Sequence, residues 1–436
     1  MSTRKEKRLK VEYKETNKLK PNPRNARTHS EKQIHKIAKS IKKLGFNNPI
    51  LVDSKEMVVA GHGRLEAAKL LGLESVPTIC LENLTSEQIR AYVIADNKLA
   101  LDSGWDNEML KIEFEELSFL DLNFDIDVTG FDTAEVDNII NFEIIEGSKK
   151  DKPDPFDELP EESEIEALVT EGDLWQLGKH KLYCGNALEE ESYKILMQDE
   201  LAAVIFTDPP YNVKIRGNVS TKQDAKEFAM ASGEMNQKEF AKFLRTVMIL
   251  KAKYSRDGSI HFQCMDWRHM HEMLVAARPV YSELKNLCVW DKKTAGMGSL
   301  YRSQHELIFV FKNGTAPHIN NVELGVNGRY RTSIWKYPGM HASNPQAKEL
   351  LNFHPTVKPT ALIMDALLDV SKPNDIVLDS FGGSGSTLIA AERTKRRAHI
   401  IELEPHYCNV ILHRYKKMTG KKAVLLGNYK NNKEAK

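Results

Sequence analysis

Cysteine is scarce in this chain. The 436 residues include five cysteines, at scattered positions and with no Cys-x-x-Cys pair. This excludes a disulfide scaffold and a cysteine-rich zinc site, and it fits a protein of the reducing cytosol. The spacing of His261, Cys264, His269 and His271 does not match a zinc site either, so we expect no bound metal.

Long apolar runs are also lacking. No stretch approaches the roughly 18–20 apolar residues that a membrane helix needs, and no apolar signal-peptide core follows the basic N-terminus. Hydrophobic residues make up 41% and charged residues 28%, which excludes a wholly disordered chain. The length corresponds to about three domains.

The formal charge of +1 hides an uneven distribution. Residues 1–43 carry 15 Lys and Arg against 4 Asp and Glu, residues 111–166 carry 4 against 19, and residues 167–436 carry 38 against 28. Two basic regions indicate a polyanionic partner that the acidic segment between them does not touch. Ordinary solvated surfaces would show the same charges, so composition alone leaves both interpretations open.

Alternating helix and strand patterns predict an α/β protein. The expected units are a small α/β domain behind a basic arm (1–108), an acidic helical connector (109–167), the largest domain (168–428) and a disordered tail (429–436). Three prolines lie in the last part of the connector, residues 149–166, which we expect to be a linker.

An acidic motif follows a buried strand of the largest domain. The apolar run 202–206 leads through Thr207 into Asp208-Pro209-Pro210-Tyr211. Ligands of open α/β sheets bind at the carboxyl ends of strands, so Asp208 is expected at the mouth of a site. The prolines stiffen the turn and leave backbone carbonyls as acceptors.

This set of groups suits the exocyclic amino group of a nucleic-acid base. Asp208 and the Pro209 carbonyl would accept its two N–H bonds, which directs the nitrogen lone pair at an electrophilic methyl group. Tyr211 would stack on the flipped base. A proline-rich turn with a surface aspartate is the alternative.

A glycine-rich turn lies between a second strand and a helix. Asp379 ends the strand, the loop 381–387 follows, and Glu402 ends the next strand, where an acid can bind ribose hydroxyls. A dinucleotide fingerprint would need glycine at Leu388, and a P-loop would need a lysine. The loop is therefore expected to approach a nucleoside without a pyrophosphate, or to be a purely structural turn.

Together with His354-Pro355-Thr356-Val357-Lys358-Pro359, these motifs make residues 170–428 resemble the S-adenosylmethionine-dependent DNA amino-methyltransferases. Their order resembles the circularly permuted β group. The resemblance implies a Rossmann-like sheet with helices on both faces, double-stranded DNA as substrate and a catalytic Asp-Pro-Pro-Tyr. It assigns S-adenosylmethionine to Asp379, Phe381, Gly382, Gly383, Gly385, Thr387, Glu402, Thr356 and Lys358. Asn186 stands where the family often has aspartate.

The resemblance also bears on the target base. No cysteine follows a proline, which argues against C5-cytosine methylation. In the family, Asp at the first position of the catalytic motif is associated with adenine N6, so we expect an adenine-specific enzyme. The alternatives are N4-cytosine methylation, an RNA or protein amino-methyltransferase, and a DNA-binding regulator with a vestigial methylase body.

Residues 290–345 are expected to read DNA, by their position in the family and by composition. Arg329, Arg331 and Lys336 lie among aromatic residues, which suits phosphate and base contact. An amphipathic loop is the alternative.

The N-terminal domain resembles the ParB/sulfiredoxin-like family through Pro21-Asn-Pro23-Arg24 and the turn Gly61-His62-Gly63-Arg64. Free N–H groups at a helix start together with an arginine attract phosphate, which makes the turn a candidate site for a nucleotide or a phosphate. Chromosome-partitioning members have Gly-Glu-Arg-Arg there, so we expect an accessory DNA-binding module without catalysis, and nucleotide binding and nuclease activity are the alternatives. A homodimer is left open.

Overall fold

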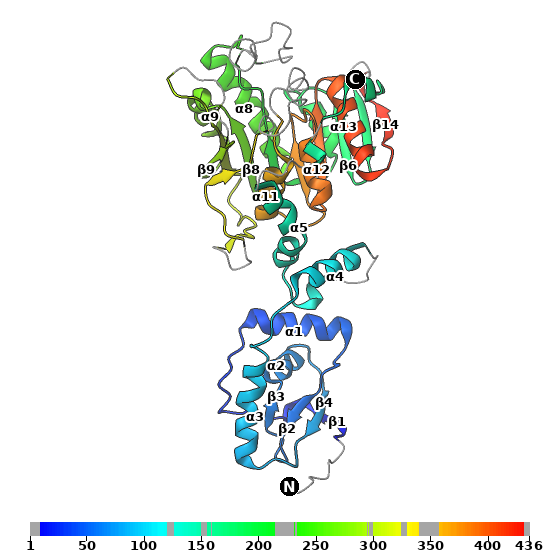
Figure 1. Ribbon diagram of the computed structural model, residues 1–436, viewed down its shortest axis with the longest axis vertical. Coiled ribbons are helices and arrows are strands. Elements are labelled where there is room, and N and C mark those ends of the chain that lie inside the picture. The colour runs from blue at the N-terminus through cyan, green and yellow to red at the C-terminus, as the bar shows by residue number, and fades with distance from the viewer. Residues whose placement is uncertain are drawn as a thin grey trace. The chain divides into compact units, whose positions relative to one another are not determined.

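The computed structural model describes residues 9–119, 126–149, 155–157, 159–213, 231, 233–293, 295, 300–323, 329–339 and 357–430. The chain separates into two compact units, residues 1–140 and 141–436 (Figure 1). Within the described ranges, no helix is both long and apolar enough to cross a membrane.

The described strands of the first unit form one sheet in the order β1-β4-β2-β3. They are β1 (Val11–Glu15), β2 (Ile50–Val52), β3 (Val58–Ala60) and β4 (Ser75–Cys80). The accompanying helices are η1 (Thr16–Lys18), α1 (Glu31–Leu44), α2 (His62–Leu70) and α3 (Ser86–Leu99). The sequence sets the helix starts, because Ser30 caps α1 and Thr85 forms a capping box with Gln88 at α3.

A second small core in this unit joins α4 (Asn107–Phe119), η2 (Ile126–Thr129) and α5 (Thr133–Lys149). Lysines of α1 are ion-paired with its acids: Lys32 and Lys36 each lie 3.0 Å from Asp132, and Lys39 pairs with Asp127. Part of the basic N-terminal charge is therefore neutralised inside the unit by the acidic connector.

The described strands of the second unit form a sheet in the order β11-β9-β10-β8-β7-β12-β13-β6-β5-β14. Their bounds are β5 (Asp173–Leu177), β6 (His180–Cys184), β7 (Ala202–Thr207), β8 (Ser255–Met265), β9 (Glu283–Asp291), β10 (His305–Lys312), β11 (Ile334–Lys336), β12 (Ile376–Asp379), β13 (Arg397–Glu402) and β14 (Val424–Asn428). The stretch β8-β7-β12-β13-β6 is parallel, and β10 runs antiparallel between β8 and β9.

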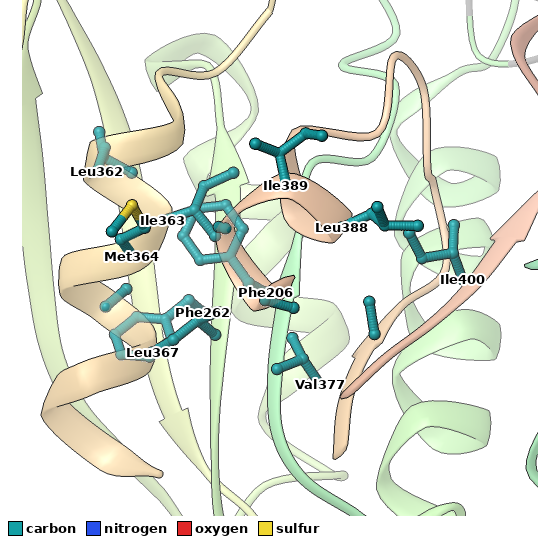
Figure 2. Close-up of a cluster of buried hydrophobic side chains, with 14 of the residues drawn as sticks. Phe206, Phe262, Leu362, Ile363, Met364, Leu367, Val377, Leu388, Ile389 and Ile400 are labelled. Carbon is teal, nitrogen blue, oxygen red and sulfur yellow. The ribbon is translucent and has the colours of Figure 1, made fainter. Parts of the chain in front are cut away.

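Helices cover both faces of this sheet. They are η3 (Pro155–Asp157), η4 (Glu162–Glu164), α6 (Glu190–Met197), α8 (Gln237–Lys253), η5 (Trp267–His269), α9 (Met270–Ala277), α11 (Thr360–Val370), α12 (Ser386–Arg393) and α13 (Pro405–Thr419). Successive side chains of a strand point to opposite faces, so Phe206 of β7 packs with α11 and α12 (Figure 2), while Ile205 packs with α6 and α8. The expected fold class is confirmed: a large α/β sheet layered by helices, with a small N-terminal α/β domain.

The expected disordered tail does not begin at Tyr429. The Tyr429 amide donates to the Gly172 carbonyl at 2.8 Å, and Lys430 is ion-paired with Glu171 at 2.6 Å. The rest of that segment, 431–436, lies outside the described residues.

Candidate active site

The parallel strands β6, β13, β12, β7 and β8 end at one edge of the sheet. The chain continues from β7 to β8 on one side and from β12 to β13 on the other, so its winding reverses between β7 and β12. Doubly wound sheets bind ligands at such a reversal. Asp208 directly follows β7 and Asp379 ends β12, and the Thr207 hydroxyl donates to Asp379 Oδ1 at 3.1 Å. The structure therefore brings the two predicted motifs together.

Asp208 lies in a hydrogen-bonded network. Its Oδ1 accepts from the Tyr211 hydroxyl at 2.5 Å, and its Oδ2 accepts from the Lys358 ammonium at 2.6 Å. The Asp208 side chain is 21% exposed, whereas Lys358 is buried. Lys358, which the resemblance assigns to the cofactor, thus contacts the predicted catalytic acid, and Thr356 lies outside the described residues.

A second carboxylate lies in the same network. Glu306 of β10 is 5% exposed, and its Oε2 lies 2.8 Å from Lys358 Nζ and 3.1 Å from the Tyr211 hydroxyl oxygen. Glu306 Oε1 pairs with Lys292. Lys358 Nζ also lies 5.5 Å from the ring centroid of Trp290. Glu306 and Lys292 were not predicted from the sequence, although an acid directly before the apolar run 307–311 was a usable signal.

These charges change several pKa values. Burial would raise the pKa of Glu306, but Lys358 and Lys292 outweigh it and lower that pKa to about 2. Burial raises the pKa of Asp208, Lys358 opposes this, and Glu306 adds to the increase. Glu306 therefore stays ionised at neutral pH, and Asp208 is the first of the two carboxylates to take up a proton.

The turn after β7 is held by hydrogen bonds to residues that precede α8. Asn212 adopts a left-handed backbone with φ of +54°, and its Oδ1 accepts from the amides of Gly233 and Met235 at 3.0 and 3.2 Å. Pro209 is buried and Pro210 is half-buried. The turn at residues 208–211 is thus held by the start of the segment that leads into α8.

Asp379 organises the glycine-rich loop. Its Oδ1 accepts from the Phe381 amide at 3.1 Å, besides the Thr207 hydroxyl, and its Oδ2 accepts from the Thr387 hydroxyl at 2.6 Å. These donors are uncharged, so burial dominates and raises the pKa of Asp379 to about 7. Asp379 therefore joins the ends of β7 and β12 to the first turn of α12.

Glu402 closes the other side of the loop. Its Oε2 accepts from the Gly383 amide at 2.7 Å, and its Oε1 accepts from the Glu404 amide at 2.9 Å. Burial raises the pKa of Glu402 to about 7 as well. The neighbouring strand β6 ends close by, because the Gly185 amide donates to the Glu402 carbonyl at 2.8 Å. Asn186 instead turns its Oδ1 to the Leu188 amide.

The loop glycines serve different needs. A Cβ on Gly382 would lie 2.5 Å from Ile400, and one on Gly385 would lie 2.8 Å from Ile411, so both are required by packing. Gly383 has a left-handed φ of +49°, and a Cβ there would meet no atom within 4 Å. This open side of Gly383 is what the approach of a ligand to the backbone requires. The buried Ser386 hydroxyl nearby in sequence has no hydrogen-bond partner among the described residues, so it too suits a ligand.

The segment before the sheet belongs to the same site. Asp157 Oδ1 accepts from the amide and the hydroxyl of Thr360, at 2.9 and 2.5 Å, and so caps α11 two residues after Lys358. Arg414 donates to the Phe156 carbonyl at 2.5 Å and to the Ser384 carbonyl of the glycine loop at 2.6 Å. The expectation of a solvated linker over 149–166 is therefore wrong at these two residues.

Two predicted DNA contacts are also corrected. The Arg329 guanidinium is 3% exposed and lies 2.6 Å from Asp369, and Arg331 lies 2.6 Å from Asp365 of the same helix, α11. Both arginines are occupied by buried ion pairs and do not present their charge to DNA. Between them, Tyr330 is 84% exposed, and Lys336 is exposed on β11.

The predicted turn of the N-terminal domain is present. Gly61 has a left-handed φ of +99° and begins α2. His62 Nε2 accepts from the Asn22 amide at 3.2 Å, and Arg64 donates to the Asn48 carbonyl at 2.7 Å. Gly63 packs closely, since a Cβ there would lie 3.0 Å from Ile37. The arginine thus lies across the helix start, and nucleotide binding there stays a prediction.

No group of three or more metal-binding side chains occurs in the described part of the chain. His261, for example, is buried and hydrogen-bonded to Ser255, Ser259 and Tyr281.

Three family profiles match the chain. The N6/N4 profile described as DNA methylase matches residues 202–413, the ParB N-terminal domain matches 2–97, and the ParB-methyltransferase helix-turn-helix domain matches 108–171. The last of these covers α4, η2 and α5. The acidic helical connector expected over 109–167 is therefore similar to a helix-turn-helix domain, which the sequence did not predict.

Similar proteins fall on both parts of the chain. The ParB-like nuclease domain-containing protein YnaK of Escherichia coli (strain K12) is 47% identical over 81 residues, which are 19% of this chain and 93% of YnaK. Type II methyltransferase M2.MboI of Moraxella bovis is 25% identical over 253 residues, 55% of this chain and 88% of its own. The crystal structure of the M1.HpyAVI-SAM complex is 20% identical, covers 53% of this chain and 97% of its own, and gives a TM-score of 0.40.

Proposed function

Because the chain belongs to the ParB-like family through its N-terminal part and carries a DNA methylase domain of the N6/N4 type, we propose that it is a site-specific DNA methyltransferase. It would transfer a methyl group from S-adenosylmethionine to the exocyclic amino group of a flipped base. The observation that carries the proposal is the bond from Thr207 to Asp379, which sets the acceptor Asp208 beside the glycine loop.

The residues after β7 would hold the amino group. Asp208 and the Pro209 carbonyl would accept its two N–H bonds, and Tyr211 would stack on the base. As the new N–C bond forms, the S–C bond breaks and its electron pair stays on the sulfur, which becomes neutral. The nitrogen then carries the positive charge and must lose a proton. Asp208 would accept that proton, and its raised pKa, caused first by burial, supports this role.

The loop after β12 would hold the cofactor. S-adenosylmethionine supplies a methyl group on a positively charged sulfur. Gly383 offers it an open backbone, Glu402 offers carboxylate oxygens to ribose, and Ser386 offers a buried hydroxyl. Asp379 would act mainly by shaping the loop, since its oxygens accept hydrogen bonds from Thr207, Phe381 and Thr387.

The finer assignment is adenine N6, with the Asp-Pro-Pro-Tyr motif and the permuted β-group order as support. The strand before the catalytic motif, β7, precedes the strand before the glycine loop, β12, along the chain and lies beside it in the sheet. N4-cytosine methylation is the second candidate. A vestigial methylase body is disfavoured, because Asp208, Tyr211, Asp379 and Glu402 are all in place.

DNA would meet the protein at the loop that the buried arginines anchor. Tyr330 stands out between Arg329 and Arg331, and Lys336 lies exposed on β11. An exposed aromatic side chain can stack on a base. Methylation of duplex DNA would thus rely on the exposed Tyr330 and Lys336 rather than on the two arginines.

Long-read modification mapping tests this function. Plasmid DNA is isolated from cells that express the full chain and from cells that express Asp208→Ala. N6-methyladenine at one recurrent sequence, present only with the wild-type chain, is the expected result. N4-methylcytosine instead would assign the other base, and unmodified DNA together with binding of S-adenosylhomocysteine would favour the vestigial body.

The N-terminal unit would add DNA affinity. A deletion of residues 1–108 is expected to make the dependence of log K on log salt shallower, by about 0.9 for each lost phosphate contact. Arg64→Ala alone should change this slope by about one unit if the turn grips a DNA phosphate, and little if it binds a nucleotide. An unchanged slope after the deletion would point to a protein partner.

A further inference from the structure

Glu306 has no role in the function proposed above, yet it shares both Tyr211 and Lys358 with Asp208. We propose that Glu306 is a positioning residue, which receives the Lys358 ammonium when the target amino group takes its place on Asp208. This inference rests on the proposed function and adds a step of substrate entry to it.

Lys358 stands where the target amino group must bind. Its ammonium donates to Asp208 Oδ2 at 2.6 Å and to the Tyr211 hydroxyl at 3.1 Å, so an N–H donor already occupies the acceptor. A carboxylate oxygen can accept along more than one direction, but Lys358 already holds one direction on Oδ2, and the Tyr211 hydroxyl holds Oδ1. We therefore expect Lys358 to give up its bond to Asp208 as the target amino group binds.

Glu306 offers Lys358 a nearby alternative. Its Oε2 lies 2.8 Å from Lys358 Nζ, so the lysine can leave Asp208 without leaving a carboxylate. The rings of Tyr211 and Trp290, 5.4 and 5.5 Å from Nζ, flank the same ammonium. Lys292 binds the other Glu306 oxygen and fixes the acid on β10. A buried ammonium without any acceptor would be costly, so this second acceptor makes the exchange feasible.

The charges of the cluster also need Glu306. Two carboxylates face two ammonium groups, and the target nitrogen gains positive charge as the N–C bond forms. Without Glu306, the cluster would hold an excess positive charge beside that nitrogen, which opposes the transition state. Lys358 would also be left with Asp208 as its carboxylate partner among the described residues and would block the acceptor more firmly.

The test compares Glu306→Gln with the wild-type full chain on duplex DNA. We expect kcat to fall about hundredfold, the effect of misplacing a reacting group, while the Kd for S-adenosylhomocysteine stays unchanged. Glu283→Gln is the matched control, an exposed acid on β9 that is ion-paired with Lys285 and should keep the wild-type kcat. A wild-type kcat in Glu306→Gln would overturn the inference. Absence of methyl transfer by the wild type would instead refute the proposed function.

The pH profile separates positioning from mere loss of structure. The titratable groups that interact with Asp208 are Glu306, Lys358, Tyr211, Asp379 of β12 and the buried thiol of Cys264, whose pKa burial raises. Removing the Glu306 charge should lower the pKa of Asp208, so the acid limb of kcat/KM should move to lower pH even as activity falls. A loss of activity with an unmoved acid limb would overturn the inference.

A double variant tests whether Glu306 acts through Lys358. In a Lys358→Met background, Glu306→Gln should cost much less than the hundredfold expected in the wild type, because the cation to be received is gone. Equal fold-losses in the two backgrounds would contradict the exchange.

Discussion

The two halves of the site treat their carboxylates differently. At β7 and β10, Asp208 and Glu306 are balanced by Lys358 and Lys292. At β12 and β13, the described bonds of Asp379 and Glu402 come from backbone amides and hydroxyl groups, and burial raises both pKa values to about 7.

This difference matches the ligands proposed for each half. A neutral amino group needs an ionised acceptor that is ready before it arrives, so the protein supplies the cations itself. A positively charged cofactor brings its own charge, and carboxylates whose described hydrogen bonds all come from uncharged donors gain most from it. The two halves thus differ in their electrostatics even without a bound ligand.

The largest effect on methyl transfer is expected in the half at β7 and β10, where the amino group is proposed to bind. Asp208→Ala should lower methyl transfer by about a thousandfold or more, because it removes the acceptor of the amino group. The Kd for S-adenosylhomocysteine, measured by calorimetry, should stay near the wild-type value. Asp208→Asn should also be severely impaired, since it lacks the anionic acceptor. Near-normal turnover in Asp208→Ala would show that the assigned role is wrong.

The cofactor half should show the opposite pattern. Glu402→Ala and Gly383→Val should weaken S-adenosylhomocysteine binding by about tenfold to hundredfold, through the lost acceptor and through a side chain where the backbone is open. Gly420→Val is a matched control, because Gly420 also has a left-handed φ of +70° and open space, but at the end of α13. Unchanged affinity in both site variants would exclude this location for the cofactor.

A change of pH is expected to have a smaller effect on cofactor affinity. Folded-state pKa values near 7 lie above the ordinary carboxyl range, so Asp379 and Glu402 hold protons at pH 6 that a cationic ligand must displace. S-adenosylmethionine affinity should rise from pH 6 to pH 8, by at most about tenfold per unit for each linked proton. S-adenosylhomocysteine, which lacks the sulfonium charge, should show a shallower rise.

The same shifts predict the sign for stability. These carboxyls bind protons more tightly in the folded state, so their contribution to the free energy of unfolding is lost as pH rises through about 7. The Lys251 ammonium titrates in the same pH range, because burial lowers its pKa to about 7. The Lys251→Met variant removes this group, so that Asp379 and Glu402 can be measured without it. An S-adenosylmethionine affinity that does not change with pH in Lys251→Met would contradict the comparison between the halves.

Sequence patterns predicted the strand-end groups well, because each depends on its neighbours in the chain. Asp208 and Asp379 each close an apolar strand, and Gly383 lies in a local turn. Glu306 and Lys292 join the site only through the pairing of β10 with β8 and β9. That pairing is not local, and a single sequence does not reveal it.

The same limit explains the error at Arg329 and Arg331. Their composition suits DNA, but Asp365 and Asp369 lie four residues apart on α11 and face both guanidinium groups. An arginine beside aromatic residues has the same sequence signature whether it meets a phosphate or a carboxylate. The docking of α11 decided between them.

The smallest effect on stability and activity is expected at residues 156–157, a segment that contacts both halves of the site. Asp157 caps α11 beside Lys358, and the Phe156 carbonyl reaches the glycine loop through Arg414. Asp157→Ala should reduce the free energy of unfolding by about 1 kcal/mol, measured by urea denaturation, because the Thr360 amide at the start of α11 loses its side-chain acceptor.

Its effect on function should be one-sided. The Phe156 contact uses the backbone and survives the substitution, so S-adenosylhomocysteine affinity should hold while kcat falls several-fold through a displaced Lys358. Asp157→Asn keeps one acceptor oxygen and should recover part of both losses. Equal losses in cofactor affinity and kcat would mean that the segment supports the domain as a whole, and that the two halves are not held by separate contacts.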